Sequence, residues 1–198
     1  MTGADPDDLA AGMLLVAAPT LLDGNFSGTV VLLLDVNADG ALGVVLNRPG
    51  TLPVGHVLEA WREVVSEPAV LFEGGPVEQQ GALAVTLLRG PWSAGEESAQ
   101  PGFREVVGRL GLLDLDTPVE LVAGAIGRLR VFAGYAGWGR GQLQREVTEG
   151  SWYVVPALAE DVFLADEDHL VDLPRRVLAR QPGDLAQHST RPLDPELN

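Results

Sequence analysis

The residues best suited to chemistry lie between Gly134 and Pro156. Tyr135 and Trp138 stand among glycines, where an aromatic ring can lie exposed over a groove. Polar side chains follow at three- and four-residue spacing, which places them on one face of a helix; they are Gln142, Arg145, Glu146 and Glu149. This pattern favours a groove with polar side chains along one side and aromatic rings at its base, which would suit a small ligand or a peptide. The alternative is that Trp138 and Trp152 anchor the core and the charges only solvate the helix.

A second polar group, Asn47-Arg48-Pro49, follows a stretch whose hydrophobicity predicts a buried strand. Asparagine can bond its own backbone and arginine offers a planar fork of donors, so this group could bind a carboxylate or a phosphate. The alternative is a turn that ends the strand, with the arginine facing solvent.

Two glycines in Gly74-Gly75-Pro76 also follow a predicted strand. They could present backbone N–H groups to an anion. The alternative is a tight turn that allows two segments of backbone to pack closely.

Residue types that support common catalytic and metal chemistry are absent or poorly spaced. The chain has no cysteine and all 13 of its basic residues are arginine, which excludes thiolate chemistry, Schiff-base chemistry and a Walker-type lysine. His56, His169 and His188 show neither H-E-x-x-H nor H-x-H spacing. Ser27 is not flanked as G-x-S-x-G. We therefore predict no catalytic residue, no metal site and no cofactor.

The charge and hydropathy of the chain restrict its partners. A formal net charge of −15 disfavours direct binding to DNA or RNA, because a polyanion repels a chain of the same sign. No apolar run approaches the roughly 20 residues that a membrane span requires. The acidic N-terminus lacks the basic region of a signal peptide. We expect a cytoplasmic protein, with a small molecule or another protein as its partner rather than a membrane.

Short strands and helices that must position these groups alternate irregularly along the chain. The hydrophobic pattern predicts strands at 13–17, 29–36, 41–46, 69–72, 82–88, 103–107, 110–115, 128–133 and 151–155. It predicts helices over 53–67, 117–126, 139–149, 158–163 and 166–181. The hairpin around Asn37-Ala38-Asp39-Gly40 and the irregular alternation favour an α+β fold over a doubly wound parallel sheet.

A single compact domain accounts for the hydrophobic pattern. Residues 1–11 are acidic and aperiodic, which is typical of a flexible arm. Residues 182–198 are rich in proline and polar side chains, which is typical of a disordered tail. Because no linker divides residues 12–181, we predict one α+β domain over that range.

Four blocks, together spanning residues 13–163, resemble the bacterial YqgE/AlgH family. They are Ala18-Pro19-Thr20-Leu21-Leu22-Asp23-Gly24-Asn25-Phe26 leading into Thr29-Val30-Val31; Gly40-Ala41-Leu42-Gly43-Val44-Val45-Leu46-Asn47-Arg48-Pro49; Gly74-Gly75-Pro76-Val77; and Gly134-Tyr135-Ala136-Gly137-Trp138 with Gly141-Gln142-Leu143, Glu146, Trp152 and Pro156. Each block alone is a weak signal, whereas four in series are specific. The chain departs from the family at Ser27-Gly28, where relatives usually have a basic residue and then serine. It departs again at Gln144, where relatives usually have an acidic residue.

The resemblance implies an α+β fold with a mixed, largely antiparallel and partly barrel-like sheet surrounded by helices. It also implies a bacterial cytoplasmic protein. One family member is named for a proposed role in regulating alginate synthesis, and no biochemical activity is firmly established for the family.

The function that we predict is a non-enzymatic regulatory module that binds a small ligand or a protein in a groove formed by the four blocks. The predicted groove residues are Asn25, Phe26, Asn47, Arg48, Gly74, Gly75, Pro76, Tyr135, Trp138, Gln142 and Glu146. The alternative is a hydrolase or transferase with Glu146 as base and Arg48 as anion clamp, which requires Glu146 within hydrogen-bond reach of Arg48 or Asn47. A third hypothesis is transcriptional regulation, without direct contact to DNA.

Overall fold

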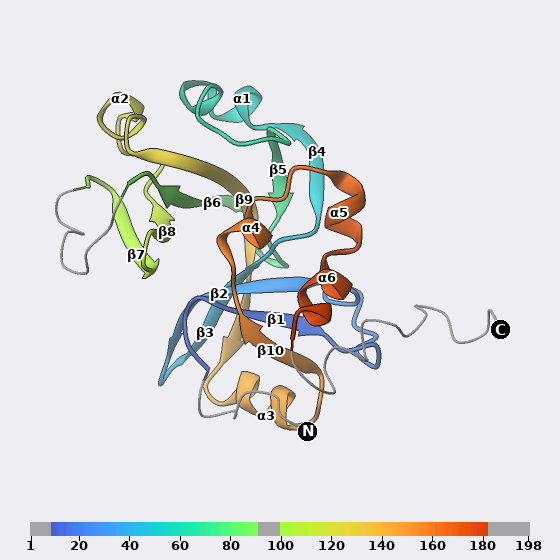
Figure 1. The fold of residues 1–198 in the computed structure, drawn as a ribbon. Helices are drawn as coiled ribbons and strands as arrows, with labels where there is room; N and C mark the ends of the chain where they lie inside the picture. Colours follow the sequence, from blue (N-terminus) through green and yellow to red (C-terminus); the bar gives the residue numbers. More distant parts are fainter. Residues whose placement is uncertain (1–8, 91–99, 182–198) are drawn as a thin grey trace.

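The computed structural model describes residues 9–90 and 100–181 (Figure 1). Its strands are β1 (Met13–Ala17), β2 (Val30–Asn37), β3 (Gly40–Val45), β4 (Pro49–Pro53), β5 (Val70–Glu73), β6 (Val77–Leu88), β7 (Phe103–Val107), β8 (Leu110–Leu113), β9 (Ile126–Gly139) and β10 (Trp152–Pro156). Its helices are α1 (Val54–Val57), α2 (Val119–Val122), α3 (Gln142–Thr148), α4 (Ala159–Val162), α5 (Glu167–Val171) and α6 (Leu173–Ala179), with a 3-10 turn at Glu59–Trp61.

The strands form one curled sheet in the order β10-β1-β2-β3-β9-β6-β8-β7, with β4 and β5 beside this path. The pairings are antiparallel except that β5 runs parallel to β9 at Phe72 and Glu73. The long strand β9 joins the two halves, because it pairs with β3 near its end and with β6 along most of its length (Figure 1). The end of β7 curls back until Val107 lies against Gly12, just before β1. The α+β fold and its partly barrel-like sheet are therefore confirmed.

Both faces of the β1–β2 part of the sheet are covered, which explains the continuous apolar run in β2. Leu14 and Val16 pack on the face covered by α4, α5 and α6, whereas Leu15 and Ala17 pack on the opposite face with Leu143 of α3. This alternation follows from the two-residue period of a strand. Figure 1 shows α3 below this part of the sheet and α4 to α6 along its side. Every residue from Val30 to Leu34 is consequently buried.

A third core cluster lies at the other end of β9, under α1 and α2. Trp61 of the 3-10 turn packs there with Val122 and Ile126. Leu9, which lies within the arm predicted over residues 1–11, is buried with the α3-side cluster. None of the helices in the described part of the chain is long and apolar enough to cross a membrane.

The predicted elements differ most from the structure in two kinds of segment. In one, residues that form helices poorly interrupt a helical pattern; in the other, pairing with distant strands extends a strand through glycines. The helix predicted over 53–67 is wrong, since α1 ends at Val57. Leu58 follows with a φ of −131° and a ψ of 69°, which are not helical, and only a 3-10 turn comes after it. Valines and Gly55 in this segment are poor helix formers. The strand predicted over 128–133 extends from Ile126 to Gly139, because β3 and β6 supply partners for its glycine-rich second half. The helix predicted over 166–181 divides between α5 and α6 at Asp172.

Candidate functional site

Trp138, Trp152 and Glu146 form a closed hydrogen-bonded group at the junction of β9, β10 and α3. Both indole Nε1–H groups donate to the Oε2 atom of Glu146, each over 2.9 Å. The other oxygen, Oε1, accepts from the side-chain amide of Gln142 over 2.9 Å. Gln142 in turn accepts the Gly139 N–H over 3.1 Å. Two members of the polar face predicted on α3, Gln142 and Glu146, therefore belong to this group, and Glu146 satisfies the buried indole donors. The other two members, Arg145 and Glu149, are exposed.

Phe26 completes an aromatic cluster with these tryptophans. Its ring stacks on Trp138 with centroids 6.0 Å apart and an interplanar angle of 23°. The same ring meets Trp152 edge-on at 5.6 Å, and the two indoles meet edge-on at 6.0 Å. Trp138 is 5% exposed and Trp152 is 3% exposed. Both tryptophans are therefore part of the core, and their rings are not open to a ligand.

Asn47 and Arg48 hold the backbone of the loop over residues 18–29, which carries Phe26. Asn47 accepts the Val30 N–H over 2.9 Å and donates to the Gly28 carbonyl over 3.0 Å. The guanidinium of Arg48 donates to the Asn25 carbonyl over 2.6 Å and to the Ser27 carbonyl over 3.4 Å. The loop is thus fixed twice, by its backbone at the end of β3 and by its phenyl ring at the tryptophans.

Gly74, Gly75 and Pro76 lie apart from this loop, in the connection between β5 and β6. The Gly74 N–H donates to the Ala133 carbonyl over 2.8 Å, and the Gly74 carbonyl accepts from Val45 over 2.9 Å. A Cβ atom added to Gly75 would lie 2.2 Å from the carbonyl carbon of Tyr135. These glycines permit close packing of backbone on β9, and the Gly74 N–H has no capacity left for an anion. Tyr135 is half-buried and packs against the α4–α6 side of the core.

A cavity of about 420 Å³ lies between the 18–29 loop and helices α5 and α6. Its polar side chains include Asn47, Arg48 and Arg175, and its apolar wall includes Val16 of β1 and Leu178 of α6. No aspartate or glutamate is among the described residues that line it. Within the described ranges Arg48 forms no ion pair, whereas Arg175 lies 3.6 Å from Asp172. The cavity is therefore an apolar recess with cationic groups at its wall.

The sequence predicted Asn47 and Arg48 for this cavity region and missed the residues from the C-terminal helices. Val171, Pro174 and Arg175 belong to a segment more than 120 positions further along the chain. Nothing in their spacing points to a shared site, because only the fold of α5 and α6 over β1 brings them there. Ser27 and Gly28, where the chain departs from the YqgE/AlgH pattern, also line the cavity.

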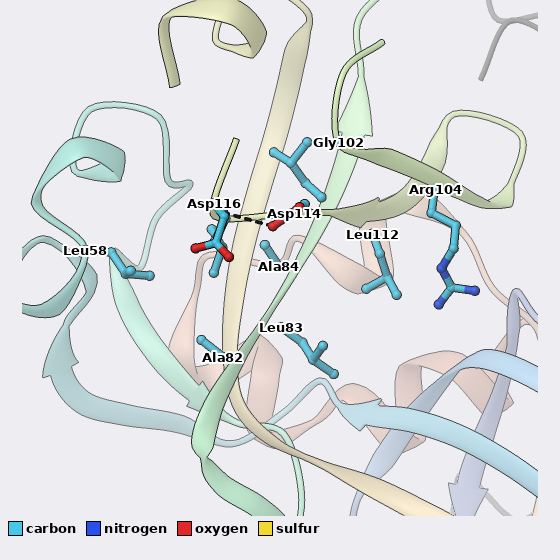
Figure 2. A pocket seen from close by; sticks show the side chains of 11 residues that line it. Leu58, Ala82, Leu83, Ala84, Gly102, Arg104, Leu112, Asp114 and Asp116 are labelled. Atoms are coloured by element: carbon cyan, nitrogen blue, oxygen red, sulfur yellow. Dashed lines mark hydrogen bonds between the residues drawn. The ribbon is translucent and has the colours of Figure 1, made fainter. Parts of the chain in front are cut away.

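A second cavity of about 470 Å³ lies over β6 and β8 and contains none of the predicted groove residues. Figure 2 shows Asp114 and Asp116 on one side of it and Arg104 on the other, with Leu112 between. Asp114 already accepts the Asp116 N–H over 2.9 Å, which stabilises the turn after β8. Because acidic and basic side chains both line this cavity and Asp114 is already hydrogen-bonded, its lining does not indicate a class of ligand.

The contact between Glu146 and Arg48 or Asn47 that the hydrolase or transferase alternative requires is not among the hydrogen bonds of the described residues. Glu146 bonds Trp138, Trp152 and Gln142, and neither Arg48 nor Asn47 is among its hydrogen-bond partners. Arg48 is directed to backbone carbonyls. Among residues 9–90 and 100–181 no group of three or more His, Cys, Asp or Glu side chains could hold a metal ion.

Arg130 on β9 is a buried charge that bonds the backbone at the end of α4 and just after it. It is 1% exposed, and burial, with a smaller effect of the nearby charge of Arg128, lowers its pKa to about 10. Its guanidinium donates to the carbonyls of Val162 at 2.7 Å, Leu164 at 2.6 Å and Glu67 at 3.2 Å. The guanidinium carbon also lies 4.1 Å from the centroid of the Phe72 ring. The sequence did contain one indication of this contact, because Arg130 lies within a strand that was predicted to be buried.

The curled sheet, the 18–29 loop held by Asn47 and Arg48, and the cavity beside that loop define a half-barrel α+β domain with a lateral cavity. Residues 14–186 match the family model described as AlgH-like, and the chain belongs to this family. A UPF0301 protein from Streptomyces coelicolor is 50% identical over 198 residues, covering 100% of both chains. A UPF0301 protein from Thermobifida fusca is 50% identical over 190 residues, covering 94% of each.

Two solved structures share the fold. Protein DIP2367 from Corynebacterium diphtheriae superimposes with a TM-score of 0.83 at 31% identity, covering 95% of this chain and 99% of that one. The solution structure of the AlgH protein from Pseudomonas aeruginosa gives a TM-score of 0.63 at 27% identity, covering 97% and 98%. The recognition of this family from the four sequence blocks is therefore confirmed.

Proposed function

We propose that the protein is a non-enzymatic binding module, and that the cavity beside Arg48 takes a small amphipathic carboxylate. The observation that carries the proposal is the pairing of Arg48 with an apolar recess. Arg48 is oriented by two backbone carbonyls and has no carboxylate partner within the described ranges. An arginine held in this way can present its remaining N–H donors to a carboxylate.

The composition of the cavity supports an anion with an apolar stem. The chain carries 28 acidic residues, yet none of the described residues that line this cavity is acidic. Pro174, which is half-buried, and Leu178 supply apolar surface to this cavity. A volume of about 420 Å³ falls within the usual range for small-molecule sites. A bound ligand would bridge the loop and α6, and this changes the surface that the protein offers to another protein.

Octanoate is a suitable probe because it combines a carboxylate with an apolar chain of suitable size. We expect titration into isotope-labelled protein to shift the NMR signals of Val16, Ser27 and Leu178. Arg48→Ala should weaken binding about tenfold or more, since a charge-assisted hydrogen bond is lost. Arg48→Lys should give an intermediate affinity, because the charge is kept and the planar fork is lost.

Arg62 offers a matched control. It also donates to a backbone carbonyl, that of Gly55 over 3.2 Å, and it is exposed and lies outside the cavity. Arg62→Ala should leave octanoate binding unchanged. Binding that is equal in wild type and Arg48→Ala, or signals that shift only at the β6–β8 cavity, would overturn the proposal.

A further inference from the structure

Two apolar side chains lie exposed at the mouth of the Arg48 cavity. Leu22, in the 18–29 loop, is 85% exposed, and Val171, at the end of α5, is 76% exposed. Both contribute to the cavity lining, so they stand at its rim with most of their surface in water. A ligand that fits wholly inside the recess would leave these side chains exposed. A ligand that continues past the mouth would cover them and gain the free energy of burying apolar surface.

The charge of the molecule restricts what such a longer ligand can be. With a formal net charge of −15, the protein repels partners that carry many negative charges. The cavity wall nevertheless offers the guanidinium of Arg48, which has no acidic partner in the described residues. A partner with one well-placed carboxylate and a neutral or basic remainder satisfies both conditions.

We infer that the occupant is the C-terminal end of a partner polypeptide whose last residue is apolar; this inference rests on the proposed carboxylate site. The terminal carboxylate pairs with Arg48, and the last side chain fills the recess against Pro174 and Leu178. The preceding residues run outward over Leu22 and Val171. A chain terminus fits because it joins a carboxylate and an apolar side chain to the same carbon atom, whereas an aspartate or glutamate carries its charge on the side chain itself. Capture of a terminal carboxylate is a known mode of peptide recognition.

The direct test compares one peptide in two forms. An N-acetylated Gly-Ser-Gly-Leu-Leu peptide carries a single charge as the free acid and none as the C-terminal amide. Calorimetric titration of the intact wild-type chain should give binding of the acid and about tenfold or weaker binding of the amide. In Arg48→Ala the difference between acid and amide should disappear, while Arg62→Ala should retain it. Thermal unfolding of each variant separates a lost contact from a disordered loop.

Substitutions at the rim provide a second test, because they leave the hydrogen bonds of Asn47 and Arg48 to the 18–29 loop in place. Leu22→Ser and Val171→Ser should weaken the peptide acid about threefold each and weaken octanoate less, because the longer ligand covers more of the apolar surface at the rim. Acid and amide that bind wild type equally, or a peptide acid that does not bind, would overturn the inference. If octanoate then still binds in an Arg48-dependent manner, the proposed carboxylate site stands and only the peptide is wrong. If neither probe binds, both proposals fail.

Discussion

Trp138 and Trp152 donate their indole N–H groups to the same carboxylate oxygen, Oε2 of Glu146, each over 2.9 Å. One comes from the end of β9 and the other from the start of β10, so a residue of α3 joins two strands that are not neighbours in the sheet. The contact explains why an ionisable residue lies among buried rings. The carboxylate is needed there as an acceptor for two buried donors, which is a structural role.

Replacing Glu146 with glutamine should destabilise the fold. Glutamine has one acceptor oxygen and one amide donor group, so it cannot accept from both indoles and from Gln142 as the carboxylate does. We expect a loss of about 1–3 kcal/mol in the free energy of unfolding, measured by urea titration with tryptophan fluorescence. Glu149→Gln, an exposed site just after α3, should change it by less than about 0.5 kcal/mol. An equal effect of the two variants would show that the shared acceptor contributes nothing.

Asn47→Ala should loosen the start of β2. The side chain of Asn47 is the acceptor for the N–H of Val30, which is fully buried. Without it we expect a loss of about 1–3 kcal/mol and much faster hydrogen exchange at the Val30 amide. Asn47→Asp keeps an acceptor for Val30 and loses the donor to Gly28, so it should largely preserve the protection of Val30. Similar exchange in Asn47→Ala and wild type would contradict the assigned contact.

Gly75→Ala should be poorly tolerated because of a close backbone approach. The added Cβ atom would lie 2.2 Å from the Tyr135 carbonyl carbon, and backbone cannot move aside as a flexible side chain can. We expect destabilisation of at least about 2 kcal/mol by thermal or chemical unfolding. Gly24→Ala provides the control, since no atom lies within 4 Å of its Cβ position. A Gly75→Ala protein as stable as Gly24→Ala would show that the turn can open freely.

Arg130→Ala should destabilise the attachment of the C-terminal helices. The carbonyls of Val162, Leu164 and Glu67 would lose their donor, and a cavity would open beside Phe72. We expect a loss of about 3 kcal/mol or more. Arg130→Met keeps most of the volume and removes the donors, so it should lose about 1–3 kcal/mol. Wild-type stability in Arg130→Met would assign the whole effect to packing, and exposed Arg128→Met is the matched surface control.

Charge at the cavity mouth should tune octanoate affinity without altering the fold. Val171→Asp should weaken binding about two- to fivefold and Val171→Arg should strengthen it similarly, because the introduced charge lies at the rim of an anion site. The effect should shrink as salt is added. Leu121, which is 63% exposed and lies outside the cavity, supplies the control pair Leu121→Asp and Leu121→Arg. Equal shifts at positions 171 and 121 would show that only net charge matters.

Much of the local structure could be predicted from the sequence, because it depends on near neighbours. The strand pair around Asn37-Ala38-Asp39-Gly40 forms as β2 and β3. The four family blocks identify the AlgH-like family correctly, since their content and order are specific. The helix face of Gln142 and Glu146 is present in α3. The spacing of these residues predicted which side chains share a face of the helix. It did not predict which residues that face contacts.

Only the tertiary structure decided how the predicted groove residues are used. Phe26, Trp138, Gln142 and Glu146 converge, and they bond and stack on one another. Gly74 and Gly75 pack on β9. The cavity beside Arg48 requires a β1–β2 loop and helices from the far end of the chain to meet, and contacts of that range depend on burial and sheet curvature. Residue types thus determined the available chemistry, while long-range packing determined which groups became anchors and which were left beside a recess.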